Sequence, residues 1–196
     1  MSFKVVSDFE NKVAQWFGAP YGVSVDCCTH GIELCLRQQN IKSITIPKRT
    51  YISIPFLANK LGIELKWKNE NWEEYYNIGE TNIYDAAVLW RENSYLPGTF
   101  MVLSFQFQKH LSLGRGGMIL TDDEESSVKL KKMTYDGRVS DVPWREQNIN
   151  TMGYHYYMSP ETATNGLKKL PEAIKTKPRK WVVNDWPDLT QMEIFK

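Results

Sequence analysis

The sequence contains few cysteines, no long hydrophobic run and almost no excess of charge of either sign. Its three cysteines are Cys27, Cys28 and Cys35, and two of them are adjacent, so the spacing shows no disulfide framework. No stretch approaches the roughly 20 apolar residues that a membrane span requires, and the N-terminus lacks the apolar region of a secretory signal. We therefore expect a cytoplasmic protein without a membrane partner.

The charges nearly cancel, with 24 Lys and Arg against 23 Asp and Glu, so the formal net charge is +1. Proteins that bind nucleic acid through its phosphates carry a basic surface, and this composition gives no reason to expect a nucleic-acid partner. Hydrophobic residues make up 42% of the 196 residues, which is enough for a packed core. This length fits one domain with a small appendage.

Short apolar strands and amphipathic helices alternate along most of the chain. The first helix is expected to begin at Ser7, with Glu10 completing a capping box, and to end at Gly18. The alternation predicts an α/β fold of three layers, in which helices cover both faces of a mostly parallel sheet. Hydrophobic spacing predicts helices at 7–18, 29–40, 51–61, 124–133 and 160–170. Continuous apolar runs predict strands at 21–25, 43–47, 63–67, 81–89, 100–105 and 116–123.

Four short stretches place chemically useful groups where strands end. The stretch VDCCTHGIEL (25–34) is a strand-to-helix turn, whose exposed N–H groups and helix dipole suit a phosphate. In KRTYISIP (48–55) an aromatic ring, Tyr51, follows a strand and could stack on a flat ligand. In IYDAAVL (83–89) a hydrophobic strand ends in Asp85, a carboxylate that needs a cationic partner or a functional reason in such surroundings.

The fourth stretch, SFQFQKHLSLGRGGMILTDD (104–123), follows a strand with Ser104, Lys109 and a glycine pair. A lysine takes part in chemistry when its amine is neutral for part of the time, which burial or a neighbouring cation favours. Each of these residues also has an ordinary structural interpretation. Lys109 fits a solvated loop and Asp85 a cap, while Thr29 fits a helix start and Tyr51 the core.

In this order and spacing, the four stretches resemble the DegT/DnrJ/EryC1/StrS family of PLP-dependent sugar aminotransferases, which have the aspartate aminotransferase fold type I. The most specific match is SF-x-x-x-K-x-L-x-x-G-x-GG-x-x-x-T-D, which is met from Ser104 to Asp122. The resemblance implies that Lys109 forms a Schiff base with pyridoxal phosphate (PLP) and that Ser104 lies beside the cofactor.

The resemblance also implies roles for the other stretches. Cys28, Thr29 and His30 fall where the family usually reads S-G-T-A-A-L, whose Thr and neighbouring residues hold the PLP phosphate. Tyr51 would lie against the pyridine ring. Asp85, in the family's D-A-A motif, would pair with the pyridinium nitrogen and so strengthen the ring as an electron sink.

The segment GYHYYMSPETATNG (153–166) resembles a family segment that reaches the cofactor of a neighbouring subunit. The resemblance therefore implies a homodimer in which His155 lies near the PLP of the other copy. Seven tryptophans in so short a chain also favour pairing, because an unpaired chain would expose an aromatic patch.

The chain also departs from the family. Only residues 66–84 stand where the family has a strand, a helix and another strand, and 171–196 stand in place of the C-terminal small domain. Val88 replaces the Gln or His that follows D-A-A, and Tyr157 replaces an arginine. We therefore expect a reduced PLP-binding large domain at 1–170, with the small domain almost absent and replaced by a C-terminal extension at 171–196.

The resemblance implies transfer of an amino group from an amino donor to a nucleotide-linked keto sugar, in amino-sugar biosynthesis for a surface polysaccharide or glycan. Lys109 would move the proton between the substrate carbon and the cofactor. The alternative is a catalytically weak or inactive PLP-binding or scaffold relic, because the departures fall on substrate recognition and turnover. We expect no metal site, since Cys and His do not recur at ligand spacing, and we interpret His110 as a loop or core histidine.

Overall fold

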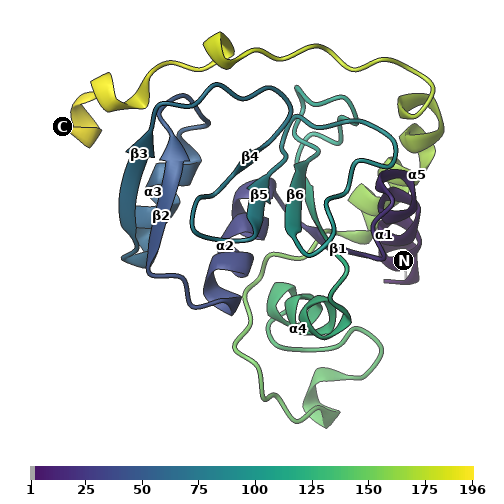
Figure 1. The fold of residues 1–196 in the computed structure, drawn as a ribbon. Coiled ribbons are helices and arrows are strands. Elements are labelled where there is room, and N and C mark those ends of the chain that lie inside the picture. Colours follow the sequence, from purple (N-terminus) through teal and green to yellow (C-terminus); the bar gives the residue numbers. More distant parts are fainter. Residues whose placement is uncertain (1–2) are drawn as a thin grey trace.

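The structure is a computed structural model that describes residues 3–196. Figure 1 shows helices α1 and α5 side by side at one edge of the molecule, with the C-terminal segment crossing the top toward the opposite side. The helices are α1 (Lys4–Phe17), α2 (Cys28–Gln38), α3 (Ser53–Leu61), α4 (Glu124–Thr134) and α5 (Pro160–Ala173). The strands are β1 (Tyr21–Val25), β2 (Ser43–Pro47), β3 (Glu64–Lys68), β4 (Tyr76–Asn77), β5 (Ile83–Asp85), β6 (Phe100–Ser104) and β7 (Gly117–Thr121). Short 3-10 turns follow at η1 (Trp144–Glu146), η2 (Val183–Asp185), η3 (Leu189–Gln191) and η4 (Glu193–Phe195).

The strands form a five-stranded sheet in the order β1-β7-β6-β5-β4 and a separate parallel pair, β2-β3. An isolated antiparallel bridge between Thr45 and Gly79 connects the two sheets, and Gly79 N donates to Thr45 O there at 2.8 Å. β1, β5 and β6 run in one direction, whereas β4 and β7 run in the other. The α/β class and the reduced size are confirmed, but the sheet is mixed rather than mostly parallel. β4 and β7 are joined to their neighbours without a crossover helix, and such connections produce antiparallel pairs.

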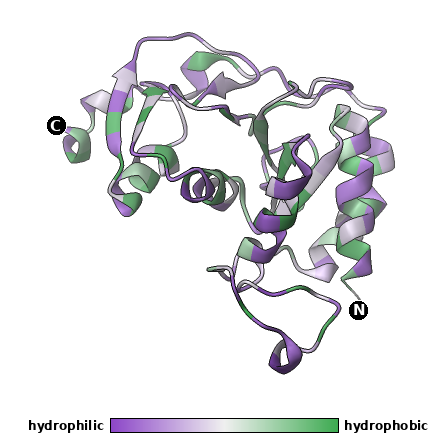
Figure 2. Ribbon diagram, turned by 60° about the horizontal axis from the view of Figure 1, so that its bottom comes forward, coloured by the Kyte–Doolittle hydropathy of each residue, from purple (hydrophilic) through white to green (hydrophobic). Residues whose placement is uncertain are grey.

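The two faces of the sheet contribute to two hydrophobic clusters. Along β6, Phe100 and Val102 join the cluster beneath α2, α3 and α4, while Met101 and Leu103 join the cluster beneath α1 and α5. This alternation is the period of a strand buried on both faces. In Figure 2, hydrophobic residues follow the strands, and α1 carries hydrophobic and hydrophilic residues on different sides. The predicted three-layer arrangement follows from this pattern.

Helix α1 begins earlier than predicted. It starts at Lys4, so Ser7 lies inside the helix instead of capping it. Glu10 does not close a capping box, because its Oε1 accepts hydrogen bonds of 2.8 Å from both the amide and the hydroxyl of Ser24, while its Oε2 pairs with Lys131. Gly18 ends the helix with a positive φ of 76°, as the sequence predicts. The buried carboxylate thus connects α1 to β1 and α4.

The strand predicted at 81–89 is restricted to Ile83–Asp85. The chain turns directly after Asp85, where the Ala87 amide donates to Asp85 Oδ1 and Leu89 N donates to Ala86 O. This early turn keeps Asp85 at the end of the strand. None of the described helices is both long and apolar enough to cross a membrane.

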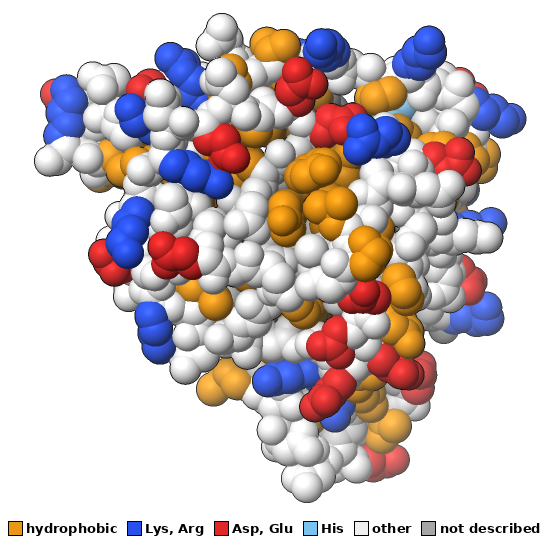
Figure 3. All heavy atoms as spheres, in the orientation of Figure 1, with side chains coloured by type: hydrophobic (Ala, Val, Ile, Leu, Met, Phe, Trp, Pro, Cys, Tyr) orange, Lys and Arg blue, Asp and Glu red, His pale blue; other side chains and the backbone are white. Residues whose placement is uncertain are grey.

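The C-terminal segment is attached to the loop that follows β2. Leu189 N donates to Lys48 O at 2.9 Å, and Arg49 Nη1 donates to Trp186 O at 2.9 Å. The segment therefore spans from α5 to the β2-β3 pair over the ends of the central strands (Figure 1). In Figure 3, charged side chains of both signs cover much of the surface on this side, and hydrophobic side chains gather near its middle.

Candidate active site

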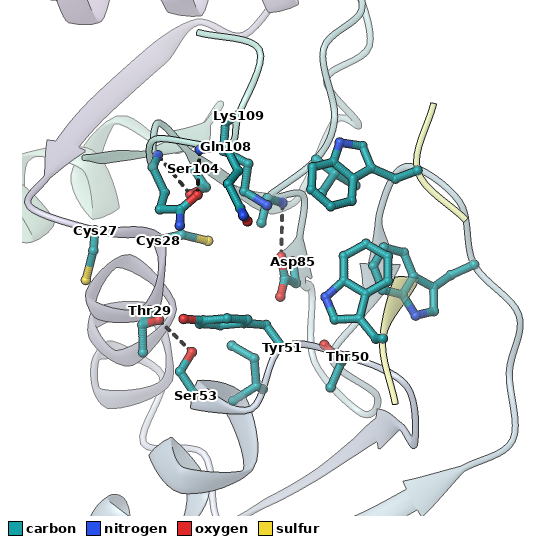
Figure 4. A pocket seen from close by; sticks show the side chains of 17 residues that line it. Cys27, Cys28, Thr29, Thr50, Tyr51, Ser53, Asp85, Ser104, Gln108 and Lys109 are labelled. Atoms are coloured by element: carbon teal, nitrogen blue, oxygen red, sulfur yellow. Dashed lines mark hydrogen bonds between the residues drawn. The ribbon is translucent and has the colours of Figure 1, made fainter. Parts of the chain in front are cut away.

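A cavity of about 320 Å³ lies where β1, β5 and β6 end, between the first turn of α2 and the C-terminal segment. The ends of strands that run in the same direction meet at one edge of a sheet, so groups placed after each strand converge there. Six of the eight predicted site residues line this cavity: Cys28, Thr29, Tyr51, Asp85, Ser104 and Lys109. Figure 4 shows them around one space, with Lys109 above and Tyr51 below.

Lys109 lies in the loop between β6 and β7. Phe107 N donates to Gly114 O, and Phe105 N donates to Gly116 O, so the loop folds back on itself. Gly114 and Gly116 have positive φ values of 83° and 152°, which side chains rarely adopt. The glycines of the motif are thus needed to return the chain and hold the lysine at the cavity.

The amine of Lys109 has a lowered pKa. Burial is the main cause, and the positive charge of Arg179 lowers the pKa further, whereas Asp85 and Cys28 oppose the shift. Lys109 Nζ lies 4.6 Å from the centroid of the Trp181 ring. A half-buried amine with a lowered pKa is neutral more often than a surface lysine, which is the condition for nucleophilic chemistry.

Asp85 is buried, with 6% of its surface exposed. The Tyr76 hydroxyl donates to Asp85 Oδ2 at 2.8 Å, and the Ala87 amide donates to Oδ1 at 3.0 Å. Burial raises the pKa of Asp85, while these hydrogen bonds and the charge of Lys109 oppose the rise. A carboxylate accepts about four hydrogen bonds, so Asp85 keeps capacity for a further donor from the cavity.

Tyr76, which supports Asp85, was missed by the sequence interpretation. Its hydroxyl also lies 2.6 Å from Thr50 Oγ1, so Thr50, Tyr76 and Asp85 form a buried chain of hydrogen bonds. Tyr76 belongs to the two-residue strand β4, which is too short to be detected by periodicity.

Tyr51 presents an aromatic face to the cavity. The residue is 59% exposed, and none of the ring contacts within residues 3–196 involves it. In Figure 4 its ring extends from the side of Thr50 toward Thr29. An exposed ring that lines a cavity is a surface on which a flat ligand can stack.

The first turn of α2 forms the opposite end of the cavity. The N-cap residue Cys27 makes no side-chain capping hydrogen bond, so the first N–H groups of the helix are free to bind a ligand. Thr29 Oγ1 and Ser53 Oγ lie 2.7 Å apart and add two hydroxyl groups. A helix N-terminus with neighbouring hydroxyls suits a phosphate. Gly117 allows this arrangement, because a Cβ there would lie 2.6 Å from Cys28 N.

His30 does not line the cavity, although the sequence places it with the phosphate-binding residues. Its Nδ1 lies 2.7 Å from Asp26 Oδ1, and its ring stacks on Tyr156 with the centroids 3.7 Å apart. Successive helical residues point about 100° apart, so His30 faces another side of α2 than Thr29. Asp26, Cys27 and His30 bring potential metal ligands within 4.8 Å of one another, but Asp26 is already paired with His30 and Arg115.

His155 also lies outside the cavity of its own chain. Its ring is exposed, and Nδ1 lies 3.1 Å from Asp136 Oδ2. The predicted contact concerns the cavity of a second copy and stays a prediction. His110 lines a neighbouring cavity, where Nε2 is 2.9 Å from Ala173 O.

Three tryptophans complete the wall and were not identified from the sequence: Trp72, Trp181 and Trp186. The ring centroids of Trp72 and Trp186 are 4.5 Å apart, and those of Trp181 and Trp186 are 5.4 Å apart. Trp72 Nε1 donates to Arg49 O at 2.8 Å. The high tryptophan content was the available signal, but no spacing connected these residues to one site.

Most of the chain matches a known protein family. The model of the DegT/DnrJ/EryC1/StrS aminotransferase family matches residues 1–67 and 97–183. Both Thr29 and Lys109 lie in the matched parts, whereas Asp85 and Tyr76 lie between them. No protein among those with curated functions matches the sequence.

Solved structures with the same fold include AtS13 and two aminotransferases, CalS13 and PseC. AtS13 from Actinomadura melliaura superposes with a TM-score of 0.75 at 19% identity, over 89% of this chain and 61% of that one. The sugar aminotransferase CalS13 from Micromonospora echinospora gives a TM-score of 0.72 at 14% identity, over 87% and 61%. PseC from Helicobacter pylori, an aminotransferase involved in the biosynthesis of pseudoaminic acid, gives 0.69 at 15%, over 84% and 57%. The chain thus spans about three fifths of the length of these structures.

Proposed function

We propose, from the premise that the chain belongs to the DegT/DnrJ/EryC1/StrS aminotransferase family, that the cavity around Lys109 binds PLP and supports transfer of an amino group. The family is PLP-dependent, as the sequence predicts. The observation that carries the proposal is the meeting of Lys109, Asp85 and Tyr51 in one cavity.

The groups around the cavity match the parts of PLP. Tyr51 offers a face for the ring, and Thr29 and Ser53, with the free N–H groups of α2, offer donors to the phosphate. The remaining hydrogen-bonding capacity of Asp85 suits a protonated ring nitrogen. Lys109 would hold the aldehyde carbon covalently. When bound, PLP supplies the electron sink that stabilises negative charge on the substrate carbon.

Each residue has a separate task in this proposal. Lys109, with its lowered pKa, would provide a neutral amine to hold PLP, and the same amine would serve as the base for the proton of the substrate carbon. Asp85 keeps the proton on the ring nitrogen, and Tyr76 holds the carboxylate in position. Ser104 lies beside Lys109 in the cavity wall.

We assign residues 1–170 to the cofactor-binding domain and 171–196 to an extension that takes the place of a small domain. The support is that Trp181 and Trp186 of the extension line the cavity and that Leu189 N and Trp186 O hydrogen-bond to residues 48 and 49. The extension thereby shields the reacting groups from water.

For the substrate, we propose a keto sugar linked to a nucleotide, with an amino acid as donor, in a cytoplasmic homodimer. The sugar aminotransferase CalS13 and the aminotransferase PseC share the fold, which supports this choice of substrate class. The cysteines are free, which supports a reducing compartment.

The experiment starts from the purified chain with added PLP. We expect an absorbance band at about 400 nm and, after borohydride reduction, a cofactor adduct on the peptide that contains Lys109. The K109A variant should lose the band and the adduct, whereas K129A, which removes an exposed lysine on α4, should keep both. An adduct that persists in K109A contradicts the assignment.

A catalytically weak PLP-binding relic is the second candidate, and Val88 favours it. Val88 lines the cavity where the sequence comparison expects Gln or His, so the wall lacks a polar group there. The relic would show the 400 nm band of about the same intensity but no amino transfer with any common donor.

A further inference from the structure

A second cavity, of about 250 Å³, adjoins the first on the other side of Lys109. Both are lined by Ala87, Val88, Ser104, Gln108, Lys109 and Trp181. Lys109 and Trp181 therefore lie in the walls of both cavities. A volume slightly below that of a drug-sized site suits a small molecule.

The two cavities differ in charge. Asp85 and four aromatic residues line the first cavity, whereas the second is lined by Arg179 and by no Asp or Glu. His110 also lines the second cavity, but its Nε2 is engaged by Ala173 O and Thr176 Oγ1, so it fixes the start of the C-terminal segment. A cationic cavity without an acidic group suits an anion.

Arg179 and Lys109 both lie close to the ring of Trp181. The guanidinium carbon of Arg179 lies 4.1 Å from the centroid of Trp181, and Lys109 Nζ lies 4.6 Å from the same centroid. Within residues 3–196, Asp185 is the one hydrogen-bond partner of Arg179, through Nη2 at 2.8 Å. Since a guanidinium has five N–H donors, Arg179 retains enough of them for a carboxylate.

We propose that this second cavity, here called the donor chamber, binds the carboxylate of the amino donor through Arg179. The inference rests on the proposed function and specifies where that site takes its donor. The amine of an amino acid that replaces the amine of Lys109 has its carboxylate only one carbon away. The anchoring cation must therefore stand close to Lys109, as Arg179 does.

The chamber is formed by the C-terminal segment, which supplies Pro178, Arg179 and Trp181. The chain spans about three fifths of the length of AtS13 and CalS13, and it takes this carboxylate anchor from the segment that follows α5. Arg179 is assigned to donor binding alone, since the groups that would hold PLP line the first cavity.

The first test uses the PLP-loaded chain and follows the cofactor spectrum during titration with L-glutamate, L-alanine and 1-aminopropane. In R179Q the concentration at half-maximal change should rise about tenfold for both amino acids, because a charge-assisted hydrogen bond is lost, and stay unchanged for 1-aminopropane. K180Q, which removes an exposed lysine next in the chain and outside both cavities, should match the native chain. Equal amino-acid titrations for R179Q and the native chain overturn the inference.

The second test does not depend on PLP. Calorimetry with the cofactor-free chain should show succinate binding that R179Q weakens about tenfold and R179K less. D185N removes the negative charge beside Arg179 but keeps an oxygen acceptor, and it should not weaken succinate binding. A loss equal to that of R179Q shows that the segment, not the charge of Arg179, matters, and overturns the inference.

Inorganic pyrophosphate serves as the competing anion. Binding that depends on Arg179 and exceeds that of succinate assigns the chamber to the diphosphate of the sugar nucleotide and overturns the donor role. If PLP does not bind but succinate binds through Arg179, the donor chamber stands and the proposed function fails. If PLP binds and R179Q changes none of these titrations, the proposed function stands and the donor role of Arg179 fails.

Discussion

The charge of the buried Asp85 can be removed without changing the shape of its side chain. Asn in its place keeps the shape of the side chain and an acceptor for the Ala87 amide, but it removes the charge that would hold a proton on the ring nitrogen. We expect D85N to retain PLP and to convert it with glutamate about 100-fold more slowly in a single turnover, because the charge acts mainly in the transition state.

Asp122 provides a matched control for this substitution. It also accepts hydrogen bonds from a tyrosine hydroxyl, that of Tyr95, and from a backbone amide, that of Gly98, but it lies outside the cavity. D122N should therefore keep the native rate. Equal rates for D85N and the native chain would remove Asp85 from the mechanism.

The raised pKa of His30 makes the free energy of unfolding depend on pH. Burial lowers its pKa, but hydrogen bonds and charges from Asp26 and Cys27 outweigh this effect and raise the pKa from 6.5 to about 9. The folded state therefore binds the proton more tightly than the unfolded state. The stabilisation is complete below about pH 6.5 and is lost as the pH rises to about 9, with a magnitude on the order of 3 kcal/mol at most.

The measurement is urea unfolding of the native chain and of H30N at several pH values. The difference between the two free energies of unfolding should decrease between pH 6.5 and about 9. A difference that stays constant over this range contradicts the prediction that the folded state holds a proton on His30.

At the scale of elements, β7 and the first turn of α2 are packed so closely that only glycine fits between them. A Cβ at Gly117 would lie 2.6 Å from Cys28 N and 2.9 Å from Leu103 O, which are backbone atoms that cannot rotate away. We expect G117A to lower the free energy of unfolding by about 2 to 3 kcal/mol. It should also weaken PLP binding, because the new Cβ would displace the first turn of α2, which is proposed to bind the phosphate.

Gly62 is the control for this prediction. It has a positive φ of 63°, but a Cβ there meets nothing within 4 Å. G62A should cost about 1 kcal/mol from backbone strain alone and leave PLP binding unchanged. Similar PLP binding in G117A and G62A would show that the contact between β7 and α2 does not shape the site.

For the whole molecule, the exposed hydrophobic side chains predict a homodimer. Phe107, Trp144 and Met152 are 65%, 68% and 78% exposed, in the Lys109 loop and in the segment that leads to His155. Trp144 and Met152 lie in one segment, and large exposed apolar side chains favour an interaction surface there. Sedimentation should give twice the chain mass of 22.8 kDa.

M152E should dissociate this dimer and lower PLP occupancy, because His155 would no longer reach the other copy. I194E introduces the same charge at an equally hydrophobic side chain near the C-terminus, 68% exposed, and should leave the dimer intact. A native chain that sediments as a 22.8 kDa monomer with full PLP occupancy would contradict the prediction.

The sequence by itself determined the local elements and the motif residues. The strands at 21–25 and 43–47 were predicted with the bounds that they have, and the family motif singled out Lys109, which lines the cavity and whose loop requires glycines at fixed positions. Asp85, which also lines the cavity, was singled out because a carboxylate directly after an apolar strand is visible in the sequence. These features depend on residues close together in the chain, so periodicity and spacing contain them.

Only the tertiary structure decided which distant residues complete the site. Tyr76 meets Asp85 through a two-residue strand, and Trp72 meets Trp186 across most of the chain, so neither contact has a local pattern. The fold also turned His30 away from the cavity and brought Arg179 beside Lys109 through Trp181. Packing between elements sets such contacts, because the free energy of burial depends on which surfaces meet and not on their order in the sequence.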